Sequence, residues 1–160
     1  MPEYKERGKE MKKFNFSLQK ILEIKEQLLQ NLKIELTNLN HECRNMESHI
    51  KNLKEKFKNT DQEYVEKTYK SISTGEMLYY KMLMESILKQ IEVKEEEREI
   101  LLKKMSVKRQ EIISMNIEIS SLEKLKEKEM EKYNKEFMRK EEIFIDEFVS
   151  NKSMSNKYAI

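Results

Sequence analysis

The chain is short of the residues that shape a compact globular fold. Its 160 residues include one proline, two glycines, one cysteine and no tryptophan, whereas 39% are charged. So few turn-forming residues and so much charge leave a coiled coil or a disordered chain as the alternatives. The apolar residues, 38% of the total, recur at helical spacing, which argues against disorder. The sequence therefore predicts long helices around a narrow core.

Long apolar runs are also missing. None approaches the ~20 residues that a membrane-spanning helix needs, and the charged first residues lack the apolar core of a signal peptide. The single cysteine, Cys43, excludes an intramolecular disulfide bond and favours a reducing compartment. We expect a cytoplasmic protein without direct membrane insertion.

An excess of charge of either sign is absent as well. The 32 basic and 30 acidic residues are interspersed and give a net charge of only +2. Proteins that bind nucleic acid concentrate lysine and arginine on one face or in one block. We therefore expect no nucleic-acid partner.

Residues that could carry chemistry are few. The glycines at positions 8 and 75 do not form a phosphate-binding loop. His41, Cys43 and His49 lie close in sequence, but the histidines lack the four-residue spacing by which one helical face chelates a metal. A straight helical rod offers no concave pocket that shifts the pKa of a carboxylate. We expect no metal, no cofactor and no catalytic residue, and hence no enzyme.

The first half of the chain has a sustained heptad pattern, which predicts a helix over residues 14–70 after a flexible extension at 1–13. Twelve of fourteen seam positions are apolar, the signal for a coiled-coil seam. The a positions are Leu22, Leu29, Leu36, Cys43, Ile50, Phe57 and Tyr64, and the d positions are Leu18, Lys25, Leu32, Leu39, Met46, Leu53 and Thr60.

A second heptad pattern predicts a helix over residues 76–149, followed by a disordered tail at 151–160. Eleven of its fourteen seam positions are apolar, and after Leu122 a spacing of eleven residues predicts a change of phase. The a positions are Met77, Met84, Ile91, Arg98, Met105, Ile112 and Ile119, and the d positions are Tyr80, Ile87, Lys94, Leu101, Lys108, Met115 and Leu122.

The segment from Ser71 to Glu76 interrupts these two patterns and includes Gly75. Ser73 and Glu76 have the spacing of a capping box, in which each side chain bonds the backbone N–H of the other residue. We therefore predict that residues 71–76 form a turn and that the chain is a long antiparallel two-helix coiled-coil hairpin.

Such a hairpin would leave part of its second helix without a partner. Reflection about the turn places Leu18 opposite roughly residue 128, using a rise of ~1.5 Å per residue. Residues 130–149 then overhang and are rich in aromatic side chains, which is typical of a protein interface. The alternative is that residues 1–17, with Phe14 and Phe16, fold back over this part of the helix.

The other end of the hairpin has a smaller apolar group. Tyr79, Met82 and Leu83 lie off the seam just after the turn and should expose apolar surface. A docking site and simple packing at the edge of the seam are both compatible with this pattern.

Read from both ends, the chain resembles the FliJ family, the small coiled-coil component of the bacterial flagellar type III export apparatus. The resemblance covers about residues 11–150. It is carried by Phe14-Asn-Phe16 near the start, Leu122-Glu-Lys-Leu125 later, and Asp146-Glu147-Phe148 near the end.

The resemblance implies a shape similar to the γ stalk of rotary ATPases and three kinds of partner: a hexameric export ATPase, a membrane export gate protein and export chaperones. It places the protein at the cytoplasmic face of the cell membrane at the flagellar base. A structural coiled-coil scaffold without an ATPase partner is the alternative. The candidates for ATPase binding are Phe14, Phe16, Leu18, Tyr133, Phe137, Phe144 and Phe148, and those for gate binding are Tyr79, Leu83, Ile87, Gln90 and Lys94.

Overall fold

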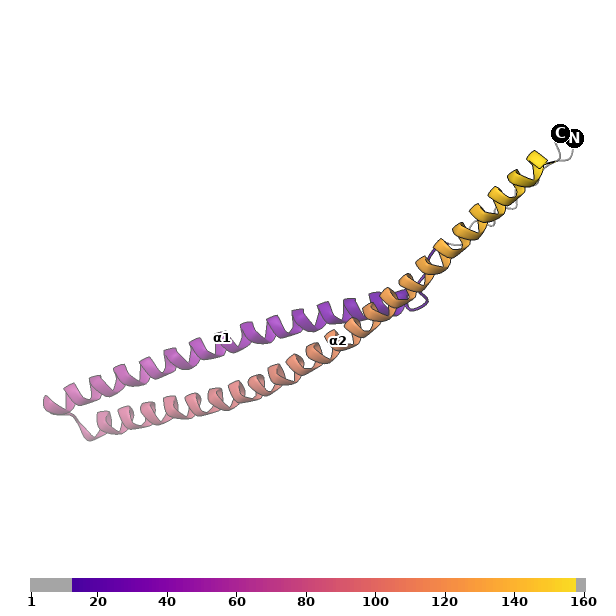
Figure 1. Cartoon of the computed structure of the whole chain (residues 1–160). Helices are drawn as coiled ribbons and strands as arrows, with labels where there is room; N and C mark the ends of the chain where they lie inside the picture. The colour runs from indigo at the N-terminus through magenta and orange to yellow at the C-terminus, as the bar shows by residue number, and fades with distance from the viewer. Residues whose placement is uncertain (1–12, 158–160) are drawn as a thin grey trace, which may run out of the picture. The chain divides into compact units, whose positions relative to one another are not determined.

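The chain is all-α over the residues that the computed structural model describes, which are 13–157 for the backbone and 13–150 and 152 for side chains. Helix α1 comprises Gln19–Tyr69 and helix α2 comprises Thr74–Lys157. The two helices pack against each other, so the predicted all-α helical hairpin is confirmed (Figure 1). Within the described part, neither helix has a stretch long and apolar enough to cross a membrane.

The helix ends differ from the expected boundaries. Helix α1 begins at Gln19 rather than at residue 14, and α2 extends to Lys157 rather than ending at 149. Residues 151–157, expected in a disordered tail, contain no glycine or proline that would end the hydrogen-bonded ladder, and they are helical. The expected flexible extension, apart from residue 13, and the last three tail residues lie outside the described residues.

The turn contains the predicted capping box. The Ser73 hydroxyl accepts a hydrogen bond from the backbone N–H of Glu76 at 3.2 Å, and Glu76 Oε2 accepts from the Ser73 backbone N–H at 3.1 Å. The hydroxyl also donates to Glu76 Oε2 at 2.8 Å. Two N–H groups that the first turn of α2 would leave unpaired are thus satisfied, which fixes where the helix begins.

The backbone reverses at Ser71, not at the glycine. Ser71 has a φ of 77°, in the left-handed region, whereas Gly75 has no positive φ and lies in the first turn of α2. A left-handed residue just past a helix end is a common way to terminate the helix, usually with glycine. The sequence therefore located the turn correctly but did not indicate which residue makes it.

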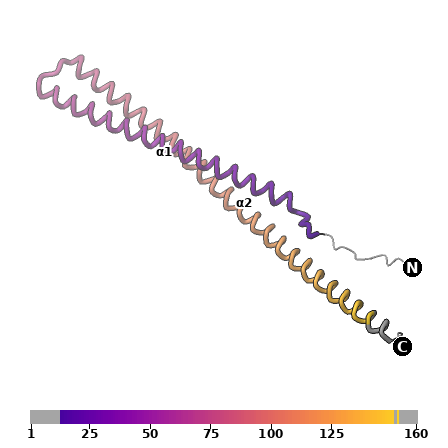
Figure 2. The backbone as a smooth tube through the Cα atoms, turned by 90° about the horizontal axis from the view of Figure 1, so that it is seen from above, coloured from indigo at the N-terminus to yellow at the C-terminus, as the bar shows by residue number. Residues whose placement is uncertain are grey.

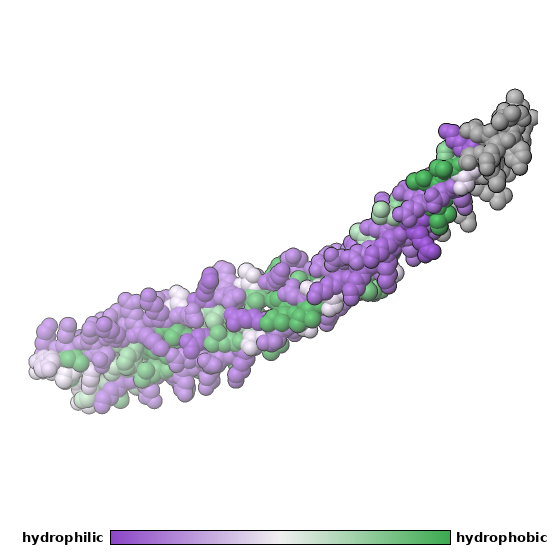
Figure 3. All heavy atoms as spheres, viewed as in Figure 1, coloured by the Kyte–Doolittle hydropathy of each residue, from purple (hydrophilic) through white to green (hydrophobic). Residues whose placement is uncertain are grey.

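The chain divides into two units, and the larger comprises residues 27–116. In this unit the later part of α1, the turn and the first half of α2 form an antiparallel pair. Its core cluster is Ile50, Leu53, Ile87 and Ile91, against which further apolar side chains pack. The hydrophobic side chains gather where the two helices meet (Figure 3).

The predicted seam matches the observed burial. Every seam position assigned above is buried or half-buried. Three cations occupy such positions in α2, and their charged groups reach carboxylates nearby: Lys94 pairs with Glu97 at 2.6 Å, Arg98 with Glu99 at 3.6 Å and Lys108 with Glu35 at 2.8 Å. Long cationic side chains can bury their stems while the charge stays near water.

The second unit comprises residues 1–26 and 117–160, of which 13–26 and 117–157 are described. Lys25 pairs with Glu118, and the Lys126 ammonium donates to Gln19 Oε1 at 2.9 Å. Half-buried residues continue at three- and four-residue spacing through Leu122, Lys126, Glu129 and Tyr133. The expected phase change after Leu122 therefore does not occur before Tyr133, because polar residues take over seam positions.

Candidate functional surfaces

The second unit contains a long exposed stretch of α2. From residue 134 to residue 150 every side chain is exposed, and α2 continues beyond the start of α1 (Figure 2). Phe144 is 64% exposed and Phe148 61%. The other exposed apolar side chains here are Phe137, Met138, Ile143, Ile145 and Val149.

An aromatic cluster lies at the base of this stretch. The rings of Phe14 and Tyr133 are 5.6 Å apart between centroids, and Phe137 stacks on Tyr133 at 6.4 Å. Phe16 is buried and Leu18 half-buried. Two phenylalanines before α1 thus pack in the unit, one of them on Tyr133, but no described residue covers Phe144 or Phe148.

The seven ATPase-binding candidates therefore divide into two groups. Phe14, Phe16, Leu18 and Tyr133 contribute to the packing of the unit, and Phe16 is only 4% exposed. The remaining three, Phe137, Phe144 and Phe148, are spaced by seven and four residues and lie on one face of α2. These three form the accessible part of the candidate surface.

At the turn end of the larger unit, Leu78, Tyr79 and Met82 are exposed. The rings of Tyr79 and Tyr80 form an edge-type contact with their centroids 5.6 Å apart. The expected exposure is found for Tyr79 and Met82. It is wrong for Leu83, which is half-buried against the core cluster because it flanks Ile87 on the seam side.

The gate-binding candidates differ in accessibility. Ile87 is 1% exposed, the most buried large side chain among the described residues, so no partner reaches it while the helices are paired. The heptad pattern had placed Ile87 at a d position, and that assignment is correct. Gln90 is exposed and donates weakly to Ser86 at 3.4 Å, and Lys94 is half-buried. Both line a hollow of about 250 Å³ with His49 and Leu53.

Local hydrogen bonds shift the pKa values of two charged side chains at the turn end, Glu76 and Lys67. Hydrogen bonds from the Ser73 backbone and side chain lower the pKa of Glu76. A hydrogen bond with Tyr80 raises the pKa of Lys67, whose ammonium lies 5.2 Å from the centre of that ring. Both groups are therefore ionised at neutral pH and flank the exposed apolar side chains.

Metal-ligating residues do not converge in the described part of the chain. No group of three or more histidines, cysteines and carboxylates there could hold a metal ion. Cys43 is buried in the seam, whereas His41 and His49 are exposed.

Over its described residues the chain is a helical hairpin with a coiled-coil seam, so it belongs to the class of coiled-coil proteins. The family model of the flagellar FliJ protein matches residues 14–157. Because this match covers most of the sequence, the chain belongs to the FliJ family. It is thus a structural component of the flagellar export apparatus, and the family is not known for enzymatic activity. Searches of curated proteins and of solved structures find no match.

Proposed function

We propose that the chain is a stalk that binds in the centre of the hexameric flagellar export ATPase and promotes assembly of that ring. In this role it also contacts the membrane export gate and returns export chaperones for reuse. Its place is the cytoplasmic face of the membrane at the flagellar base.

The exposed aromatic face of α2 supports this proposal most strongly. Phe144 and Phe148 continue the line of Tyr133 and Phe137 beyond the start of α1 at Gln19, so aromatic residues persist where no described helix faces them. Apolar patches of this kind mark protein interfaces, and aromatic side chains are frequent energetic hot spots there.

The test is to mix the purified chain with the export ATPase of the same organism. We expect ATP turnover to rise and the ATPase to assemble into rings, measured by turnover assay and by mass. The double variant Phe144→Ala and Phe148→Ala should weaken binding by about tenfold or more, as hot-spot truncations do. A well-folded parent chain that changes neither turnover nor ring mass would contradict the proposal.

The matched control is Leu88→Ala with Ile113→Ala. Both side chains are about half exposed on α2 of the larger unit and lie outside the seam. This variant loses a similar amount of exposed apolar surface, so it should stimulate the ATPase as the parent does. Equal loss of stimulation in both variants would show that general apolar surface, not the aromatic face, is responsible.

For the gate, the accessible residues near the turn are Tyr79, Met82, Gln90 and Lys94. We expect Tyr79→Ala with Met82→Ala to weaken binding to the purified gate protein while ATPase stimulation is unchanged. Calorimetry measures binding to the gate protein, and the turnover assay measures stimulation of the ATPase. Loss of ATPase stimulation in this variant would contradict the assignment of the two ends to different partners.

A further inference from the structure

One face of the larger unit has a stripe of asparagines on α1. Asn31, Asn38, Asn45, Asn52 and Asn59 follow one another at intervals of seven residues, and all five are exposed. In a coiled coil, a seven-residue interval keeps side chains on one line along the helix. The stripe is therefore uncharged over four heptads of a chain in which 39% of residues carry charge.

Helix α2 has a matching apolar stripe. Val93, Ile100 and Val107 have the same spacing and are exposed. The ion pair between Glu35 and Lys108 shows the antiparallel register of the two helices. In that register the two stripes are level residue by residue: Asn38 with Val107, Asn45 with Ile100, and Asn52 with Val93.

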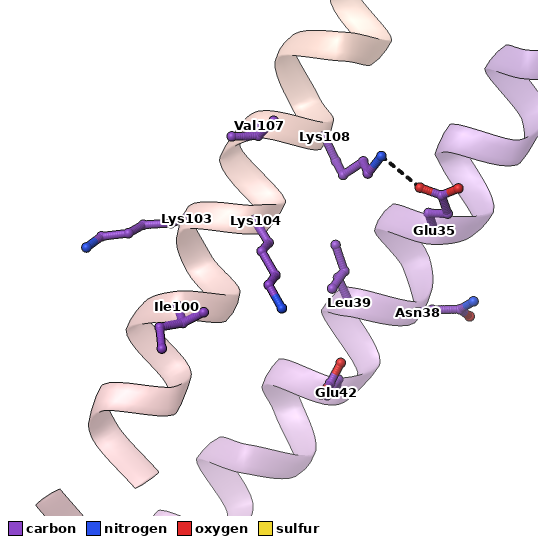
Figure 4. A pocket seen from close by; sticks show the side chains of 9 residues that line it. All are labelled: Glu35, Asn38, Leu39, Glu42, Ile100, Lys103, Lys104, Val107 and Lys108. Carbon is purple, nitrogen blue, oxygen red and sulfur yellow. Dashed lines mark ion pairs between the residues drawn. The ribbon is translucent and has the colours of Figure 1, made fainter. Parts of the chain in front are cut away.

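A groove lies between the two stripes. One part of it, a hollow of about 600 Å³, is lined by Leu39 and Glu42 of α1 and by Ile100, Lys104 and Val107 of α2, among others. Figure 4 shows Leu39 and Lys104 pointing into the space between the helices, which the Lys108–Glu35 ion pair crosses. The hollow beside Leu53 and Val93 lies on the same face, fourteen residues along each helix.

The groove has unpaired charges of opposite sign on its two sides. Glu42 of α1 and Lys104 of α2 both line it. Within the described part of the chain, neither makes a hydrogen bond or an ion pair, whereas the neighbouring Lys108 pairs with Glu35 at 2.8 Å and with Glu111 at 2.9 Å. The acidic side and the basic side are therefore both available to an occupant.

We propose that this face pairs with the same face of a second copy of the chain. The two copies lie parallel and are related by a twofold axis that runs along the groove. Rotation about that axis brings α1 of one copy opposite α2 of the other at the same level. Glu42 then faces Lys104 of the second copy, and the asparagine stripe faces the apolar stripe.

The same charges disfavour the opposite arrangement. An antiparallel pairing, with the twofold axis across the groove at the level of Glu42, would bring α1 opposite α1 and place Glu42 near its own equivalent. Like charges that face each other oppose association. Parallel pairing also covers Gln90 and Lys94. If these residues bind the gate, as proposed above, the paired form cannot engage it.

The mass of the full chain between micromolar and millimolar concentration tests the pairing, by sedimentation equilibrium. We expect a reversible rise from one chain to two. Ile100→Lys with Val107→Lys places charges in the groove and should weaken pairing at least tenfold, with helicity by circular dichroism unchanged. Leu88→Lys with Ile113→Lys, at equally exposed positions off the groove, is the control and should pair like the parent.

The orientation is tested by mixing two charge variants. Glu42→Lys alone and Lys104→Glu alone should each pair weakly, because like charges then face each other twice. A mixture of the two should pair as well as the parent, since every contact becomes one between opposite charges. An interaction within one chain cannot produce this rescue.

The proposal is overturned by a chain that stays monomeric at every concentration, which would leave the groove to water or to a helix of another protein. Equal weakening by the groove variant and its control would also overturn it. Absence of rescue in the mixture would overturn the parallel arrangement. None of these measurements involves the ATPase, so they do not depend on the stalk function.

Discussion

The two ends of α2 use the same kinds of side chain in opposite ways. In the larger unit, Ile87 and Tyr80 face α1 and are buried. In the smaller unit, Phe144 and Phe148 belong to the same helix but no described residue covers them. The difference is the presence of a partner helix, not the composition of α2.

In this coiled coil, the apolar side chains that stabilise the fold and those that remain exposed for recognition lie in different regions. Where α1 is present, apolar side chains lose contact with water on folding and stabilise the pair. Beyond the start of α1, Phe144 and Phe148 stay mostly exposed, so their burial contributes little to folding. Truncation in the two regions should therefore affect different measurements.

The largest effect is expected for Ile87→Ala. Removal of a buried isoleucine side chain costs about 2–5 kcal/mol through lost transfer energy and the cavity left behind. Phe144→Ala should change stability by less than about 0.5 kcal/mol, because exposed substitutions rarely do more. Urea unfolding followed by circular dichroism compares the two. A cost for Phe144→Ala as large as for Ile87→Ala would mean that the end of α2 is packed.

A second, smaller effect sharpens the boundary between the units. Phe16 is buried in the smaller unit, so Phe16→Ala should cost up to about 3 kcal/mol there. We expect faster amide hydrogen exchange in α1 before Gln27 and in α2 around Ile119, with exchange around Ile91 unchanged. If exchange accelerates equally in both places, the two units unfold as one.

A third effect, a loss of stability in the paired region, is expected from a substitution in the turn. Ser73→Ala removes the cap of α2 and should cost about 1 kcal/mol. Because the pKa of Glu76 is lowered in the folded protein, its contribution is present above the ordinary pKa of glutamate and lost as pH falls through the lowered value. Unfolding of Glu76→Gln against pH should lack this acid-dependent part. An identical pH profile for parent and variant would contradict it.

The smallest expected effect is a gain in stability. Gly75 lies in α2 without a positive φ, and an added Cβ would meet no atom within 4 Å. Gly75→Ala should therefore stabilise the protein by about 0.5–1 kcal/mol, since alanine favours the helix and restricts the unfolded chain. A loss of stability would show that the first turn of α2 needs the flexibility of glycine. Thermal unfolding measures the change.

Much of the fold could be predicted because a coiled coil repeats one local rule. The seam assignment held even at Lys94, Arg98 and Lys108, since the heptad spacing was stronger evidence than the identity of any one residue. The capping box was likewise legible, because both of its side chains are close in sequence. The exposed aromatic face could be predicted because more helical residues follow the turn than precede it, so the end of α2 extends beyond the start of α1.

The remaining features depend on geometry that the pattern does not encode. The left-handed residue is Ser71, which no composition rule favours over Gly75. The resemblance supplied Ile87 as a gate-binding candidate without its orientation, and the structure shows that this side chain is buried. The level alignment of the asparagine and apolar stripes needed the register of α1 against α2, which only the paired structure provides.

The buried thiol of Cys43 can report how often the two helices separate. The side chain is 5% exposed at the middle of the seam, and it is the only cysteine. A thiol reagent reaches it only when α1 and α2 move apart, so its labelling rate reports how often the middle of the hairpin opens. The same labelling rate, measured with and without the ATPase, would show whether binding to the ring slows separation of the two helices.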